Sequence, residues 1–126
     1  MKRTYTFLLF LIIQFFIGCG TIKEYQRVIT SIEIEDIDLS RVADGEYRGE
    51  CDAVIVKATV LVKVKDHRIT EIQLVEHKHG RGEKAEVLPE KVVASQSLKV
   101  DTITGATSSS KAILKAVEQA LLKGIG

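Results

Sequence analysis

A stretch of alternating residues in the middle of the chain constrains the fold more than any other feature. From residue 54 to residue 64 every second residue is apolar, and from residue 57 onward those between are lysine or threonine, with Leu61 as the exception. A period of two with one apolar face is typical of an antiparallel sheet. We expect Asp66-His67-Arg68 to form a turn and residues 69–77 to return, with Ile72 and Leu74 inward. The expected inward residues before the turn are Val54, Val56, Ala58, Val60, Val62 and Val64, and the outward ones are Lys57, Thr59, Lys63 and Lys65.

Helical patterns follow this hairpin. Pro89 suits the first turn of a helix that continues to about Ser95. A longer amphipathic helix is expected over residues 108–123, with Gly124 at its end. Its apolar stripe is Ala112, Ile113, Ala116, Val117, Ala120 and Leu121, opposite Lys111, Lys115, Glu118 and Lys123. With an earlier strand over 47–51, the pattern predicts an α+β fold in which a small antiparallel sheet packs against two helices.

The segment Asp101-Thr102-Ile103-Thr104-Gly105-Ala106-Thr107 joins an extended stretch, 98–100, to the last helix. A glycine-containing turn that opens a helix gathers unpaired N–H groups and the positive end of the helix dipole. This arrangement is typical of a phosphate site, and a threonine hydroxyl there can be esterified to a phosphate. The same side chains also fit a simple loop-to-helix cap, and so do Ser108, Ser109 and Ser110.

The seven residues resemble the flavinylation motif of FMN-binding domains, Asp-x-x-Ser/Thr-Gly-Ala-Thr, with every specified position present. The resemblance extends over residues 44–123 in the order of features: Asp44-Gly45-Glu46-Tyr47-Arg48-Gly49, a hairpin, a glycine loop, a helix that starts at proline, the motif and a last helix. The family includes the flavin-carrying subunits of sodium-pumping NADH:quinone reductases and RNF complexes, and small secreted lipoproteins.

The resemblance implies FMN as a covalent cofactor, joined through its phosphate to Thr107 by a Mg-dependent flavin transferase that takes FMN from FAD. Asp101 would be recognised with Mg²⁺ during transfer, or would fix the turn through backbone N–H groups. The flavin site would lie at the N-terminus of the last helix. The expected cofactor-binding residues are Thr107, Asp101, Thr104, Gly105, Ala106, Ser108, Gly80 and Gly82.

Gly80-Arg81-Gly82 stands where the family places a glycine loop against the flavin, and an ordinary flexible loop is the alternative. Tyr47 fits either a ring that stacks on the flavin or a half-buried strand residue. His77 and His79 lack a third ligand at a known spacing, so we expect exposed strand-end residues and no metal site. No acid, base and nucleophile set is expected, which favours a redox carrier over an independent enzyme.

The first 18 residues have the pattern of a targeting segment. Lys2 and Arg3 precede an apolar run over 7–17, interrupted by Gln14, and Phe16-Ile17-Gly18-Cys19-Gly20 resembles a bacterial lipobox. Since Phe16 stands where the family usually has leucine, an uncleaved N-terminal anchor is the alternative to lipidation at Cys19. Both outcomes place the domain at the outer face of the cytoplasmic membrane.

Charge and composition bound the rest of the chain. Without residues 1–18 the formal charge is 16 − 17 = −1, which offers no electrostatic footprint for nucleic acid. We expect a signal peptide over 1–18, a membrane tether that partly docks as an extended arm over 19–43, and one FMN-binding domain over 44–126. The expected function is extracytoplasmic electron transfer, with a quinol or another redox protein as partner. The alternative is a lipoprotein that binds a flavin or phosphate ligand reversibly, or a sensory or scaffold module.

Overall fold

Three antiparallel strands pair in the order in which they occur along the chain: β1 (Gly45–Ala53), β2 (Val56–Lys65) and β3 (Arg68–Lys78). This computed structural model describes residues 22–125. Asp66 and His67 connect β2 to β3 with φ of 52° and 60°. Positive φ at both central residues suits a two-residue hairpin turn, because its twist matches that of the strands. The predicted hairpin and the earlier strand are thereby confirmed.

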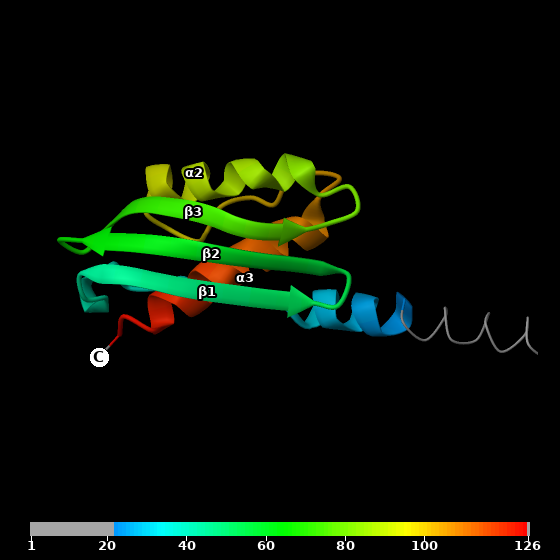
Figure 1. Ribbon diagram of the computed structural model, residues 1–126, viewed down its shortest axis with the longest axis horizontal. Coiled ribbons are helices and arrows are strands. Elements are labelled where there is room, and N and C mark those ends of the chain that lie inside the picture. Colours follow the sequence, from blue (N-terminus) through cyan, green and yellow to red (C-terminus); the bar gives the residue numbers. More distant parts are fainter. Residues whose placement is uncertain (1–21, 126) are drawn as a thin grey trace, which may run out of the picture.

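Helices cover one face of this sheet, as Figure 1 shows. The short helices are η1 (Leu39–Arg41) and η2 (Glu83–Val87), and the longer ones are α2 (Leu88–Ser95) and α3 (Thr107–Leu122). α3 packs against β1 and β2, while α2 packs against β3. Pro89 lies in the first turn of α2, and Gln96 ends that helix in the left-handed conformation. The predicted α+β fold, with a sheet packed against helices, is confirmed.

The core lies between the sheet and α3. All six residues of the predicted apolar stripe of α3 are buried, and so are five of the expected inward residues of β2, namely Val56, Ala58, Val60, Val62 and Val64. Val54 departs from the prediction, since 46% of it is exposed. β1 ends at Ala53 and β2 begins at Val56, so Val54 lies in the connecting turn, where its φ is 69°.

Thr59 also departs from the prediction, because it is fully buried although it was expected on the wet face. β2 is the central strand, and Thr59 pairs with Glu50 on one side and Glu76 on the other. A register shift in β3 adjoins this position. Within the described residues the Thr59 hydroxyl has no hydrogen-bond partner.

The segment before β1 was expected as an extended arm, but residues 22–31 are helical, and residues 32–38 have no regular secondary structure. The helix has a physical reason: Tyr25, Val28 and Ile29 recur at helical spacing and are the partly buried residues of this stretch. Ile34, Ile37 and Leu39 then pack against the core, so the arm is docked. We refer to residues 22–38 as the arm.

Glu118 corrects a further expectation, since it is buried although it was expected on the polar face of α3. Its carboxylate accepts hydrogen bonds from the Glu35 backbone N–H, at 3.1 Å, and from Lys115 Nζ, at 2.9 Å. The docked arm therefore covers the face of α3 that sequence periodicity alone assigns to solvent.

Burial raises the pKa of the Cys51 thiol, against an opposing effect of Lys115 and with a contribution from Asp52 in the same direction as burial. A thiol with a raised pKa behaves as a small apolar residue of the strand and not as a reactive group. The predicted signal peptide over 1–18 and the predicted lipidation site Cys19 lie outside the described residues. Among the residues that are described, no helix has the length and apolar character that a membrane crossing needs.

Candidate functional site

A cleft of about 380 Å³ lies at the N-terminus of α3. It brings together residues that are far apart along the chain and that the sequence singled out separately. Its lining includes Gly105, Ala106, Thr107 and Ser108 from the motif and Gly80, Arg81 and Gly82 from the glycine loop. The other lining residues are Tyr25, Ile55, Val56 and Ser109. The cleft has the size of small-molecule sites in proteins.

The first turn of α3 forms the polar end of this cleft. Within residues 22–125, no side chain caps the helix at its N-cap residue, Ala106. The alternative interpretation of these side chains as a loop-to-helix cap therefore does not hold at Ala106. Uncapped N–H groups in a first turn are donors for an anion, and the helix dipole favours negative charge there. Thr107 is exposed at this turn.

The turn before α3 is held from within the helix. The Ile103 N–H donates to Ser110 Oγ at 3.0 Å, and the Ser110 hydroxyl donates to the Ala106 carbonyl at 2.7 Å. The Ala106 N–H closes the turn on the Ile103 carbonyl at 2.9 Å. Gly105 has a φ of 82°, which favours glycine, and its Cα faces open space. The motif thus places small, accessible residues beside Thr107.

Asp101 and Thr104 are exposed and do not line the cleft. Within the described residues Asp101 makes no side-chain hydrogen bond or ion pair. The turn is held by Ser110. The Asp101 carboxylate therefore does not fix the turn, which was one of the two roles expected for it.

The glycine loop lies over the N-terminus of α3. A Cβ at Gly82 would lie 1.8 Å from Ser109 Oγ, whereas one at Gly80 would meet no described residue within 4 Å. Gly82 thus permits direct contact between the loop backbone and the helix. The Gly82 N–H also donates to His79 Nδ1 at 3.1 Å.

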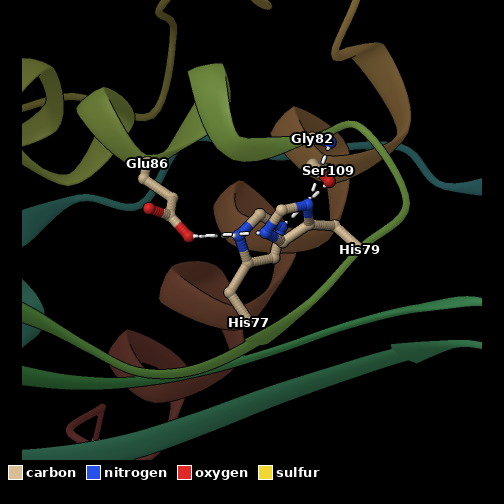
Figure 2. Close-up of polar contacts among 5 residues, drawn as sticks. All are labelled: His77, His79, Gly82, Glu86 and Ser109. Carbon is tan, nitrogen blue, oxygen red and sulfur yellow. Dashed lines mark hydrogen bonds and ion pairs between the residues drawn. The ribbon is translucent and has the colours of Figure 1, made fainter.

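His77 links this loop region to the helix, as Figure 2 shows. Its side chain is only 2% exposed, so the expectation of an exposed strand-end histidine is wrong for this residue. Nδ1 lies 3.0 Å from Glu86 Oε1, and Nε2 lies 2.9 Å from Ser109 Oγ. Because a carboxylate only accepts, it orients the ring with Nδ1–H toward Glu86, and Nε2 then accepts from the Ser109 hydroxyl.

Glu86, His77 and Ser109 follow the order acid, imidazole, hydroxyl that serine hydrolases use. The hydroxyl is not available for attack, however, because Ser109 is 2% exposed and the Gly82 Cα lies directly against it. The chain of hydrogen bonds therefore ties β3 and η2 to the first turn of α3. It shapes the cleft rather than supplying a nucleophile.

Glu86 also completes a set of three possible metal ligands with His77 and His79, whose ligand atoms lie within 4.8 Å of one another. Two features oppose a shared ion. His79 Nδ1 accepts the Gly82 N–H, so in a neutral ring the proton is on Nε2. The two imidazoles are stacked, with centroids 4.4 Å apart and planes at 30°, so their in-plane lone pairs do not converge. The geometry favours hydrogen bonding over a tetrahedral site.

Tyr47 does not belong to the cleft. Its hydroxyl donates to the Ala43 carbonyl at 2.6 Å, and its ring packs beside Gly124, after the C-terminal end of α3. The stacking alternative for Tyr47 is therefore wrong. Sequence reasoning missed Tyr25 and Ile55 as cleft residues. Tyr25 had a signal, because it lies on the apolar face of a helical pattern; Ile55 had none.

The cleft suits an FMN molecule in its chemistry. Uncapped helix N–H groups and the Thr107 and Ser108 hydroxyls fit the phosphate, open glycine backbone permits close approach, and Ile55 and Val56 offer apolar surface to the ring. No curated protein matches the chain. The family model of the FMN-binding domain matches residues 56–122, which is 67 of 126 residues. The chain therefore belongs to the FMN-binding domain family, with FMN as its cofactor.

Proposed function

We propose that the protein is an extracytoplasmic electron-transfer module that carries FMN covalently, through its phosphate, on Thr107. One observation carries this proposal: an exposed threonine hydroxyl lines a cleft at the uncapped N-terminus of α3. The helix end favours a phosphate at the position where the hydroxyl can be esterified. Membership of the FMN-binding domain family supports the choice of FMN.

The attachment is a phosphoryl transfer. The Thr107 Oγ attacks the phosphorus of the FMN half of FAD, so that an Oγ–P bond forms and the P–O bond to the AMP half breaks. AMP leaves, and the hydroxyl proton passes to a base of the flavin transferase, whose Mg²⁺ offsets the phosphate charge. The exposed Asp101 carboxylate is free for recognition by the transferase and its metal.

Covalent attachment fits a protein outside the cytoplasm. Even nanomolar binding, about 12 kcal/mol, does not retain a cofactor against continued dilution. Lipidation of Cys19, or an uncleaved segment over 1–18, would hold the domain at the outer face of the cytoplasmic membrane. The ring would then take electrons from a quinol or dehydrogenase and pass them to another redox protein, while the chain tunes and positions it.

The decisive experiment co-expresses the full chain with a flavin transferase and then denatures it. We expect flavin fluorescence to stay with the protein band and the intact mass to include FMN. Thr107→Ala should lose the fluorescence and the added mass. The control Thr102→Ala should keep them, because the motif accepts any residue at this position of the same exposed segment. Asp101→Ala should lose the label and keep its circular dichroism spectrum.

Flavin that is released by the denaturant from an unmodified chain would contradict covalent attachment. That result would favour the alternative of reversible flavin binding. Normal labelling of Asp101→Ala would remove the role given to this carboxylate.

A further inference from the structure

Part of the cleft is built by residues outside the segment that matches the family. Tyr25, on the helical part of the arm, and Ile55, in the β1–β2 turn, both line the cleft that contains Thr107. Both precede the matched residues 56–122. Ile55 is 47% exposed, while Tyr25 is partly buried and packs against the core. In Figure 1 the arm helix lies near the end of β1 where this turn begins.

The arm is fixed to the same helix that forms the polar end of the cleft. Lys111 Nζ donates to the Ile29 carbonyl at 3.2 Å, and Lys115 Nζ donates to the Glu33 carbonyl at 3.0 Å. Further along, the Glu35 N–H donates to the buried Glu118 carboxylate. These three α3 residues recur at helical spacing on one face, so the arm runs along α3 in the same direction.

The two ends of the cleft differ in chemistry. The α3 end offers N–H groups and hydroxyls, whereas Tyr25, Ile55 and Val56 offer apolar surface. A flavin held at Thr107 by its phosphate carries a planar aromatic ring, with an apolar dimethylbenzene part, on the flexible ribityl chain. Aromatic rings stack on such surfaces, and burial of apolar area is favourable. Tyr25 and Ile55 therefore form the part of the cleft that suits the flavin ring.

We infer that the arm is a wall of the flavin site and that Tyr25 stacks against the isoalloxazine ring. This inference rests on the proposed function for the identity of the ligand. It makes the segment between membrane and domain a part of the cofactor site. Five residues lie between Cys19 and Tyr25, a span of at most about 20 Å, so a lipid on Cys19 would hold the ring close to the membrane surface.

The test uses the full chain in detergent, first labelled with FMN by the transferase. A phenol ring in contact with a flavin quenches its fluorescence, so Tyr25→Leu should raise the fluorescence per bound flavin severalfold. Tyr25→Trp should restore the quenching, because indole also quenches on contact. The control Tyr47→Leu removes the tyrosine that packs beside Gly124 and should leave the fluorescence unchanged.

A second measurement titrates free FMN into the unlabelled chain. Loss of one stacked ring should raise the Kd of Tyr25→Leu by about two- to tenfold, with no such rise for Tyr47→Leu. Equal fluorescence and equal Kd in parent and Tyr25→Leu would overturn the inference. A parent that binds FMN in a Tyr25-dependent way but never gains covalent flavin would overturn the proposed attachment and leave Tyr25 as a wall of the site.

Discussion

At the scale of single residues, the contact between Gly82 and Ser109 decides how the glycine loop lies on α3. The Ser109 hydroxyl also donates to His77 Nε2, so one hydroxyl joins the loop, β3 and the helix. The role of Gly82 is spatial, since its φ of −93° is open to any residue. A methyl group there has no room beside a hydroxyl that is already hydrogen-bonded.

We predict that Gly82→Ala destabilises the protein by about 1–3 kcal/mol, because the added Cβ forces the loop away from Ser109. The same substitution at Gly80, where a Cβ meets no atom of the described part of the chain within 4 Å, should change stability by less than about 0.5 kcal/mol. Urea unfolding of both variants measures the difference. Equal midpoints for the two variants would contradict the role of this contact.

At the scale of elements, Asp36 fastens the arm to the loop after α2. Its carboxylate accepts from the Leu98 N–H at 3.0 Å and from the Ser97 hydroxyl at 2.8 Å. Burial by itself would raise the pKa of Asp36. The hydrogen bonds from Leu98, Ser97 and Ile37, together with nearby Lys99, outweigh burial and hold this pKa below its usual 3.8. The carboxylate therefore stabilises the fold above pH 3.8, and this contribution is lost as the pH falls through the lowered value.

We predict that Asp36→Asn lowers the free energy of unfolding at pH 7 by about 1 kcal/mol, since it weakens the hydrogen bonds that hold the arm. The difference from the parent should shrink as the pH falls below 3.8, because the parent carboxylate then becomes protonated. Urea unfolding at several pH values measures it, with Asp66→Asn in the exposed β2–β3 turn as control. A difference that grows on acidification would contradict this account.

At the level of the whole molecule, one hydrophobic core lies between the sheet and α3, and the arm packs against the same core. The sheet and α3 approach each other closely at Gly49, where a Cβ would lie 1.8 Å from the Ala116 carbonyl oxygen and 2.7 Å from the Ala120 nitrogen. Both are backbone atoms of α3, so they cannot move without the helix. The Ala43 N–H also donates to the Gly124 carbonyl, which joins the chain before β1 to the chain after α3.

Gly49→Ala should therefore destabilise the whole domain by about 3 kcal/mol, since α3 must move away from β1. This is a large fraction of the stability of a small domain. Thermal unfolding measures it, with Glu50→Ala on the exposed side of β1 as control, expected within about 0.5 kcal/mol of the parent. Parent-like melting of Gly49→Ala would show that the layers are not in contact at this point.

The amino-acid sequence was enough to predict the hairpin, the order of the elements, the apolar stripe of α3 and the small, accessible turn before Thr107. These follow from local periodicity and from backbone preferences, which act between near neighbours in the chain. The motif also indicated FMN as cofactor, in agreement with the match to residues 56–122.

The tertiary structure alone decided which polar residues are buried and which segments meet at the cleft. The Glu118 side chain is buried with a hydrogen bond from Glu35, which lies 83 positions away in the chain. The His77 side chain is buried with a hydrogen bond to Ser109, which lies 32 positions away. Only the folded chain brings these partners together. Tyr25 joins the cleft only because the arm docks along α3. Such pairings depend on the packing of distant elements, because a polar side chain is stable in the interior only where the fold supplies its partner.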